Sequence, residues 1–246
     1  MKTKMAIISL LLGASSAWAT LITDNFDRAD TTRTTYTVNV GGSGWTQSGD
    51  GVNPASDWWI SGNTARGRAR ASDAVMYNTD LSTVSGGGDS FTLSTDVMTL
   101  NGGYWNGVAF NYTDADNMYF IRFKSDTGEY QLIERNDGVQ TTHVNTTLSS
   151  GTFAQDVSYT ITVASDAAGK FNYSILNGAT VVVSGSVDDS ANAVTGGYAG
   201  LYTTGLDNAA QGVYDNFSLE VIPEPATLGL FSVAFGLILV IRKIRD

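Results

Sequence analysis

Pairs of carboxylate side chains can carry out acid–base or nucleophilic catalysis. Two carboxyl groups about 5 Å apart can cleave a glycosidic bond by double displacement. Residues 20–221 contain only three glutamates, Glu129, Glu134 and Glu220. Glu129 and Glu134 are five residues apart, and an odd spacing on a regular strand places two side chains on opposite faces. We therefore predict that these glutamates do not form such a pair unless a bulge intervenes.

Aspartates are too numerous for counting alone to exclude an acid–base pair. They cluster, however, in short segments such as residues 114–117 (DADN) and Asp188-Asp189. Aspartate is frequent in turns because its carboxylate accepts hydrogen bonds from nearby backbone amides. We interpret these clusters as turns.

His143 is the only histidine of the chain, which excludes a metal site with two or more histidines. A Ser-His-Asp relay would have to use it. It lies in the polar segment QTTHVNTT, which is predicted to be an exposed strand, and no nucleophile-elbow sequence is present. The sequence does not favour a catalytic role for His143.

Aromatic rings beside amide or guanidinium groups suit the binding of sugars, whose apolar faces stack on such rings. Tyr104, Trp105 and Asn106 follow a glycine-rich loop, and Phe120 and Arg122 lie on the next predicted strand. Two adjacent large rings cannot easily both point inward. We predict that these five residues form a carbohydrate-binding site.

An alternating pattern of apolar and polar residues runs through residues 20–221. In SYTITVAS, for example, Tyr159, Ile161 and Val163 alternate with threonines, as in a half-buried strand. Short turns such as Asp137-Gly138 and Asn177-Gly178 separate such segments. The pattern predicts an all-β protein, an antiparallel β-sandwich or jelly roll.

Three consecutive strands are predicted near residues 107–112, 118–124 and 129–135. Alternation along the middle strand predicts which side chains face the core and which face outward. The inward set is Tyr119, Ile121 and Phe123, and the outward set is Phe120, Arg122 and Lys124.

The charge of residues 20–221 limits the partners of this domain. They hold 22 of the 24 acidic residues but only 9 of the 14 basic ones. Binding of nucleic acid requires cations that displace counterions from the phosphates, so nucleic acid is excluded as a partner. The chain has no cysteine, so disulfides and Cys-ligated metals are excluded as well. About 200 residues suit one domain.

The two ends of the chain are apolar. Residues 1–19 carry Lys2 and Lys4, a short hydrophobic stretch and the small-residue sequence Ala17-Trp18-Ala19, which predicts a cleavable signal peptide. Residues 226–241 form a 16-residue apolar run followed by three basic residues. This run is slightly shorter than the roughly 20 residues of a comfortable bilayer span, and we predict a single hydrophobic helix that holds the chain in the membrane.

The last 25 residues, which begin IPEPATLGLF, resemble the PEP-CTERM sorting signal of Gram-negative, exopolysaccharide-producing bacteria. The matching elements are Pro223-Glu224-Pro225, the apolar run and the basic end. The resemblance implies that exosortase recognises residues 222–246 and removes the tail. It also implies delivery to the cell surface or to the extracellular matrix.

Residues 20–221 resemble the concanavalin A-like, or laminin-G-like, jelly-roll superfamily, through the strand pattern of residues 104–138, the segment WWISGN (58–63) and the matched ends Asp24-Asn25-Phe26 and Asp215-Asn216-Phe217. The resemblance implies that the first and last strands are neighbours. It also implies a structural calcium ion, held by the side chain of Asp215 and by backbone carbonyls of the Asp24–Asn25 segment and of the turn at Gly62. Oxygen ligands of this kind suit calcium.

Two functions remain open from the sequence. The first is an exported surface or matrix protein whose sandwich binds polysaccharide without catalysis. The second is a glycoside hydrolase or lyase that acts on the polysaccharide through carboxylates that the sequence does not identify.

Overall fold

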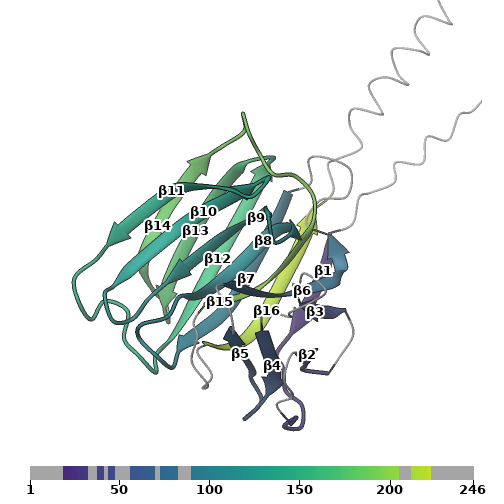
Figure 1. The fold of residues 1–246 in the computed structure, drawn as a ribbon, viewed down its shortest axis with the longest axis vertical. Coiled ribbons are helices and arrows are strands. Elements are labelled where there is room, and N and C mark those ends of the chain that lie inside the picture. The colour runs from purple at the N-terminus through teal and green to yellow at the C-terminus, as the bar shows by residue number, and fades with distance from the viewer. Residues whose placement is uncertain are drawn as a thin grey trace, which may run out of the picture.

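Two β-sheets pack face to face in the computed structural model (Figure 1). The structure describes residues 19–32, 38–41, 44–47, 56–69, 73–82, 90–204 and 212–222. All regular elements in these ranges are strands, which confirms the predicted all-β antiparallel sandwich. The described residues include no helix that could cross a membrane. The predicted signal peptide, the motif Pro223-Glu224-Pro225 and the hydrophobic segment after it lie outside the described residues.

The larger sheet, sheet A, has nine strands. In spatial order eight of them are β14 (Thr180–Asp188), β13 (Lys170–Asn177), β12 (Ser158–Ala167), β7 (Ser90–Thr99), β16 (Gly212–Ile222), β5 (Ala65–Ala69), β4 (Ser56–Ile60) and β2 (Val38–Asn39). The ninth, β1 (Thr20–Asp24), pairs with β16. Neighbours are antiparallel except β2 and β4, which are parallel.

The second sheet, sheet B, has seven strands. In spatial order they are β11 (Val139–Thr147), β10 (Glu129–Asn136), β9 (Asn117–Phe123), β8 (Asn106–Asp114), β15 (Tyr198–Thr204), β6 (Asp73–Ser82) and β3 (Trp45–Gln47). The strands β8 to β11 follow one another in the chain and in space, as a meander. The predicted limits of β8, β9 and β10 agree with the observed ones to within two residues.

Alternation decides which side chains form the core. Along β7 every second residue is buried and the others are partly exposed, as expected where one face of a strand lies on the core. The main core lies between the sheets and includes Trp58, Tyr119, Ile121 and Phe123. Burial of each such side chain contributes on the order of 1.5–3 kcal/mol.

A second, smaller apolar cluster lies on the opposite face of sheet B. It contains Phe120 and Tyr202, with Trp105 and Tyr77 packed against it. Since Phe120 and Ile121 are successive residues of β9, their side chains point to opposite faces. The predicted division of β9 into inward and outward residues is therefore confirmed. From here on, the face of sheet B away from the core is called its outer face.

The chain enters and leaves the sandwich at neighbouring positions. β1 and β16 are antiparallel, and Thr20 lies opposite Val221. At the other end of this pair Asp24 lies opposite Phe217, so the two Asp-Asn-Phe segments are neighbours, as the resemblance implied. Phe26 and Asn216 have φ of 51° and 50°, a left-handed conformation that is uncommon for residues other than glycine.

Candidate functional site

Trp105 lies just before β8, at the edge of the outer cluster of sheet B. Its backbone is fixed to β15, since its amide donates to Thr204 Oγ1 at 3.2 Å and its carbonyl accepts from the Thr204 amide at 2.9 Å. The indole packs on the outer cluster and is only partly buried. Trp105 therefore presents part of a rigidly held aromatic ring at the surface.

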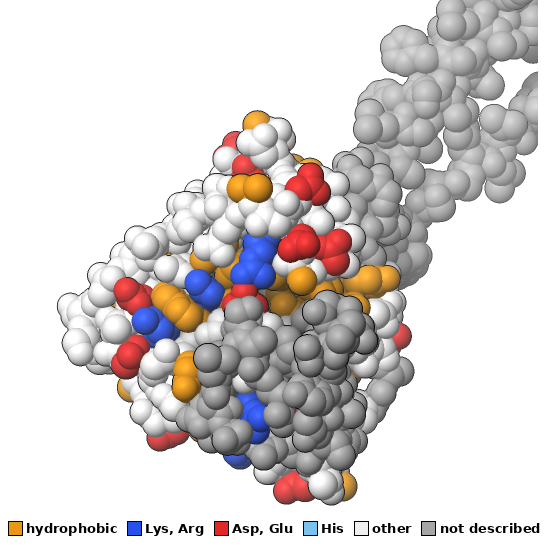
Figure 2. All heavy atoms as spheres, in the orientation of Figure 1, with side chains coloured by type: hydrophobic (Ala, Val, Ile, Leu, Met, Phe, Trp, Pro, Cys, Tyr) orange, Lys and Arg blue, Asp and Glu red, His pale blue; other side chains and the backbone are white. Residues whose placement is uncertain are grey.

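Two cations flank this ring, Arg122 on β9 and Lys124 directly after the end of that strand. Arg122 Cζ lies 4.5 Å from the centroid of Trp105, and Lys124 Nζ lies 4.9 Å from it. Both separations are in the range of cation–π attraction. Basic and apolar side chains are also seen together in a band across the face viewed in Figure 2. The arrangement arises because the chain stays beside β10 past the end of β9, where the Lys124 amide donates to the Glu129 carbonyl at 2.9 Å. Positions 122 and 124 are two apart and therefore share a face.

All three nitrogen atoms of the Arg122 guanidinium donate hydrogen bonds. Its Nε and Nη2 donate to Gln131 Oε1 at 3.0 and 2.8 Å, and its Nη1 donates to Tyr202 Oη at 2.6 Å. Gln131 lies directly opposite Arg122 on β10. Because Arg122 is a planar donor with several fixed partners, its position beside Trp105 is determined before any ligand binds.

Asp73 joins this network from β6. Its carboxylate accepts hydrogen bonds from Tyr202 Oη and from Arg135. Burial, and next the charge of Asp73, raise the pKa of Tyr202 well above its ordinary value, so this hydroxyl stays protonated and can donate. The side chains of Arg122 and Asp73 are each 13% exposed.

We call this group the Trp105 surface. It consists of Asp73, Trp105, Arg122, Lys124, Gln131, Arg135 and Tyr202. The sequence predicted Trp105 and Arg122 as site residues but missed the others. The pairing of β9 with β10 and of β15 with β6 brings them together, and no local pattern in the sequence specifies those pairings.

Phe120 points to the predicted face but is fully buried. Its ring stacks on Tyr202 at a centroid distance of 4.7 Å and an interplanar angle of 11°. Arg122 and Arg135 lie over it, with their Cζ atoms 5.1 and 5.4 Å from its centroid. The prediction that Phe120 contacts a sugar is therefore corrected: it supports the residues of the Trp105 surface from beneath.

Asn106 is also fully buried, on the core side of β8. Its Oδ1 accepts hydrogen bonds from Thr203 Oγ1 at 2.8 Å and from Tyr214 Oη at 3.3 Å. The prediction that Asn106 binds sugar is wrong, because its side chain is used between the sheets. Tyr104 lies in the turn before β8, half-buried, with its amide donating to the Asn101 carbonyl at 3.3 Å.

Of the predicted calcium-binding positions, Gly62 lies between β4 and β5, whereas Asp24, Asn25 and Asp215 lie where β1 meets β16. A pocket of about 340 Å³ is lined there by Thr23, Asp24, Asn25, Asn216, Phe217 and Ser218. Asp24 is already well partnered, since its Oδ2 accepts from Arg28 Nη2 at 2.5 Å and from Trp45 Nε1 at 2.8 Å. The Asp24 carboxylate is thus already partnered, and the calcium role that the resemblance implies for this segment, through backbone carbonyls, stays a prediction.

Asp215 is the residue whose side chain the resemblance assigns to the calcium ion. Burial, and next the charges of Asp96, Asp24 and Asp27, raise its pKa above its ordinary value, so a cation placed beside it would stabilise its ionised form. The other predicted positions already hold local hydrogen bonds. Asn25 Oδ1 accepts from the Asp27 amide at 3.2 Å, and the Gly62 amide donates to Asp30 Oδ1 at 2.8 Å.

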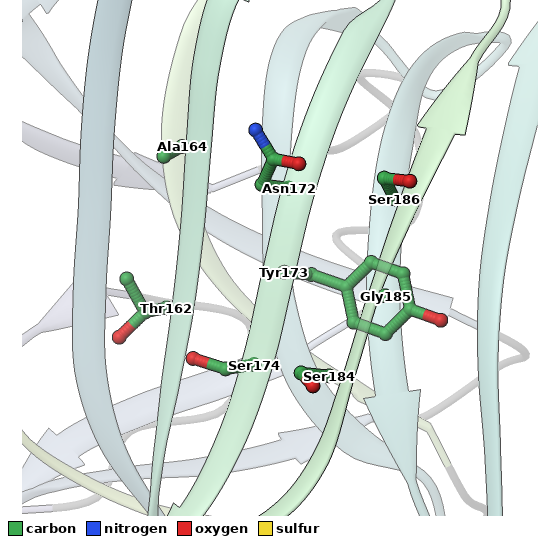
Figure 3. Close-up of a pocket in the computed structure, with 8 residues that line it drawn as sticks. All are labelled: Thr162, Ala164, Asn172, Tyr173, Ser174, Ser184, Gly185 and Ser186. Atoms are coloured by element: carbon green, nitrogen blue, oxygen red, sulfur yellow. The ribbon is translucent and has the colours of Figure 1, made fainter.

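A shallow groove of about 490 Å³ lies over β12, β13 and β14 of sheet A (Figure 3). Small polar side chains line it, with Thr162, Ser174 and Ser186 among them. Tyr173 is the one aromatic residue of this lining, and it is only 7% exposed. The groove therefore offers hydroxyl groups but no ring on which a sugar could stack.

No family model matches the chain, and a search of curated proteins finds no match. Among solved structures, the chain is similar to the carbohydrate-binding module CBM66 from Bacillus subtilis, with a TM-score of 0.55 and 18% identity over 72% of this chain and 96% of that one. A peanut lectin has a TM-score of 0.54 and 11% identity over 84% of this chain and 100% of that one.

The fold is also found in part of a larger enzyme. The GH43 protein BlXynB from Bacillus licheniformis has a TM-score of 0.50 and 13% identity, over 81% of this chain and 39% of that one. At these identities the similarities show the fold alone. They confirm that the chain is a jelly-roll sandwich.

Proposed function

We propose that the sandwich binds polysaccharide through the Trp105 surface, without catalysis. The observation that carries the proposal is the partly exposed indole of Trp105 with Arg122 and Lys124 fixed beside it. A pyranose ring can stack on an indole, while guanidinium, amide and carboxylate groups bind its hydroxyls. The fold shared with a carbohydrate-binding module and a lectin is in keeping with this function.

The carboxylates near Trp105 argue against cleavage there. Hydrolysis requires one carboxyl group that is protonated at working pH. Asp73 is bound by Arg135, and Glu129 Oε2 lies 2.8 Å from Lys124 Nζ. The hydrogen bond from Lys124 and next that from Thr127 lower the pKa of Glu129. Glu129 is thus stabilised in its ionised form, which suits binding and not general acid catalysis, and the Asp73 carboxylate is occupied by Arg135 and Tyr202.

Export and sorting form the second part of the proposal. Its support is the sequence: the signal peptide predicted at residues 1–19, and the Pro223-Glu224-Pro225 motif with its apolar run and basic end. In this proposal the tail inserts in the membrane until exosortase removes it. The sandwich is then released to the cell surface or the exopolysaccharide matrix of a Gram-negative bacterium. Retention of an epitope tag placed after residue 246 on the mature protein would contradict processing.

A binding assay combined with an activity assay tests the polysaccharide proposal. The full-length protein is applied to a glycan array, and release of reducing sugar from crude exopolysaccharide is measured alongside. We expect binding without turnover, and loss of binding in Trp105→Ala with a fall in melting temperature of less than about 4 °C, the shift that about 1 kcal/mol produces in a domain of this size. Release of sugar that a single Asp→Asn substitution abolishes would contradict the proposal.

The matched control is Asn172→Ala, in the groove of sheet A. Asn172 is exposed and lies on the other sheet, so its removal should leave glycan binding unchanged. If Asn172→Ala loses binding while Trp105→Ala keeps it, the site lies on sheet A and the assignment to Trp105 is wrong. A collapse of the melting temperature in Trp105→Ala would show that the ring serves the core.

A further inference from the structure

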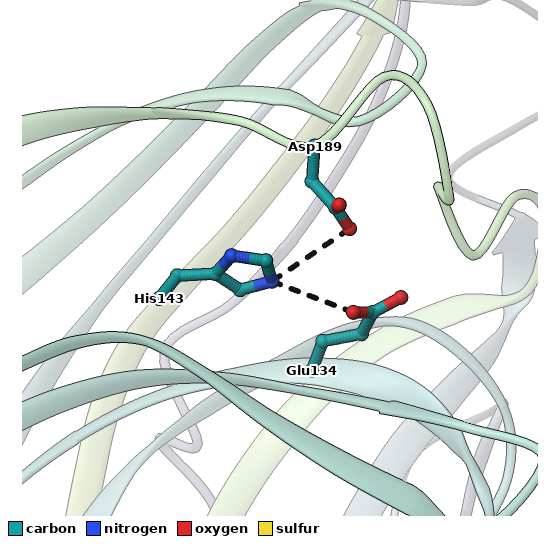
Figure 4. Close-up of side chains that lie close together, drawn as sticks. All are labelled: Glu134, His143 and Asp189. Carbon is teal, nitrogen blue, oxygen red and sulfur yellow. Dashed lines mark ion pairs between the residues drawn. The ribbon is translucent and has the colours of Figure 1, made fainter.

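The single histidine of the chain lies between two carboxylates (Figure 4). His143 Nε2 is 3.5 Å from Glu134 Oε2 and 3.6 Å from Asp189 Oδ2. One ligand atom from each residue falls within 4.8 Å of the other two. We call this group the His143 cluster. It is separate from the Trp105 surface, because Glu134 lies on the core side of β10, opposite Tyr119.

A β-bulge directs His143 into this cluster. In the pairing of β10 with β11, Leu132 lies opposite Val144 and Ile133 lies opposite Thr142. His143 is therefore an extra residue of β11, and such a residue breaks the alternation of its strand. In Figure 4 its ring points toward Glu134 and Asp189. The bulge explains why the side chain is mostly enclosed on a strand that is otherwise largely exposed.

Asp189 comes from the loop after β14, and its backbone is anchored. Its amide donates to the Gly169 carbonyl at 2.8 Å, and its carbonyl accepts from the Asn192 amide at 3.0 Å. Ser190 is bound by the neighbouring Asp188, which acts as the predicted turn residue. The side chain of Asp189 therefore faces the cluster. The cluster connects sheet B to the loop after β14, at the edge of sheet A.

The three side chains of the cluster are largely enclosed. Glu134 is 3% exposed, and the side chains of His143 and Asp189 are 14% and 10% exposed. A buried pair of carboxylates is costly unless a cation accompanies it. His143 Nε2 is buried and has no hydrogen-bond partner, although it points at both carboxylates.

The spacing of the three atoms fits a shared metal ion better than a shared proton. Both separations from Nε2 exceed the usual 2.7–3.2 Å of an N–H···O hydrogen bond. A metal bound tetrahedrally at about 2.0–2.2 Å from each ligand holds neighbouring ligand atoms about 3.4 Å apart. The observed 3.5 and 3.6 Å are close to this value. The separations of His143 from each carboxylate would therefore need little change.

Outer hydrogen bonds hold both carboxylates in place. Tyr119 Oη donates to Asp189 Oδ2 at 2.6 Å and accepts from the Val194 amide at 3.2 Å. Asn136 Nδ2 donates to Glu134 Oε1 at 3.3 Å, which leaves Oε2 directed at His143. Partners of this kind orient metal ligands and are needed for full affinity.

We propose that Glu134, His143 and Asp189 bind one divalent transition-metal ion of the zinc type. One imidazole with two carboxylates suits zinc better than calcium or magnesium, which prefer oxygen ligands alone. The ion links β10 and β11 to the loop after β14. Because the chain has no cysteine, a disulfide cannot provide this cross-link. Its remaining coordination position is open to water or to a ligand.

Zinc titration of the full-length chain tests the proposal. Protein treated with EDTA and dialysed is titrated with zinc chloride in a calorimeter, and its melting temperature is measured with and without zinc. We expect about one equivalent to bind and the melting temperature to rise, because a ligand that binds only the folded state stabilises it. His143→Gln and Asp189→Asn should each weaken zinc binding at least tenfold. Calcium should not produce the same response.

Two matched controls locate the ion. Glu129→Gln changes a glutamate on the opposite face of β10, and Asp215→Asn changes a carboxylate beside β1. Both should bind zinc as the unaltered chain does. Binding that persists in His143→Gln and Asp189→Asn but is lost in Asp215→Asn would overturn the proposal.

A spectroscopic measurement covers the case in which a cluster variant does not fold. Since the chain has one histidine, its imidazole gives one set of nitrogen-15 signals, and no variant is needed to assign them. Added zinc should shift the Nε2 signal of the unaltered protein strongly and reversibly on addition of EDTA. An imidazole signal that does not respond to submillimolar zinc would overturn the proposal.

Discussion

The guanidinium of Arg122 lies over the indole of Trp105, with Cζ 4.5 Å from the ring centroid. The position is not set by this pair alone, because Gln131 and Tyr202 accept hydrogen bonds from the same guanidinium. The side chain of Arg122 therefore loses little conformational entropy when a ligand binds beside Trp105. A site held in this way is fixed by strand pairing and does not depend on a flexible loop.

Replacement of Arg122 by lysine should weaken polysaccharide binding about tenfold, or about 1.4 kcal/mol. Lysine keeps the charge but cannot reproduce the planar set of donors to Gln131 and Tyr202. Binding is measured by affinity electrophoresis in gels that contain the exopolysaccharide. The control is Lys124→Arg, which exchanges the same two residue types at the neighbouring cation and should change binding less than about twofold. Equal losses in both variants would mean that charge alone is recognised.

Gly107→Ala should destabilise the sandwich by about 2 kcal/mol or more. A Cβ at Gly107 would overlap the carbonyl oxygen of Ile121 on β9, and backbone atoms cannot move aside as a flexible side chain can. The measurement is the free energy of unfolding in urea. Gly103→Ala is the control, because its nearest contacts would be side-chain oxygens at 3.8 and 3.9 Å, and it should cost less than about 0.5 kcal/mol. Similar losses in both variants would contradict the packing argument.

Much of the fold could be predicted from the sequence because alternation is a local property. The sequence pattern around Tyr119, Phe120 and Ile121 assigns each side chain to a face, and the structure agrees. Alternation also predicts opposite faces for Trp105 and the next residue, Asn106. With Trp105 on the outer face, Asn106 belongs on the core side. Phe120 shows the limit of the alternation rule. Its side chain points away from the core, but other side chains cover it and it is fully buried.

The rest of the site depends on contacts that are distant in the chain. Asp73 and Tyr202 meet through the pairing of β6 with β15, across 129 positions of sequence. His143 was predicted to be exposed because its strand is polar, and the bulge that turns it inward is visible only in the register of β10 and β11. The sequence predicts a turn at Asp189, which is correct for its backbone but does not describe its side chain, because that side chain faces His143.

Calcium should stabilise the protein through Asp215, if the ion that the resemblance implies binds there. Asp215 has a raised pKa from burial and from neighbouring carboxylates, and a bound cation would relieve this repulsion. We expect millimolar calcium to raise the melting temperature of the unaltered chain but not that of Asp215→Asn. Asp188→Asn, an exposed carboxylate at the end of β14, should respond as the unaltered chain does. If calcium does not change the melting temperature of the unaltered chain, the prediction of a calcium site at Asp215 is wrong.

The ion pair of Glu129 with Lys124 should make stability fall in acid. Lys124, and next Thr127, lower the pKa of Glu129 below its ordinary value of 4.5, because only the ionised carboxylate accepts both hydrogen bonds. Its contribution is therefore complete above about pH 4.5, where the unfolded chain is also ionised, and is lost as the pH falls through the lowered value. Glu129→Gln should cost less than about 1 kcal/mol at pH 7, as for other surface pairs.

Urea denaturation at pH 7 and at pH 3 measures this effect. The gap between Glu129→Gln and the unaltered chain should be smaller at pH 3, because protonation removes the charge that the substitution removes. Glu220→Gln, on β16, is the matched control for the loss of a carboxylate elsewhere. A gap that stays the same at both pH values would show that glutamine disturbs packing instead. Since Lys124 also lies 4.9 Å from the centroid of Trp105, glycan binding should be measured on the same variant, and a change there would mean that this ion pair positions Lys124 for the ligand.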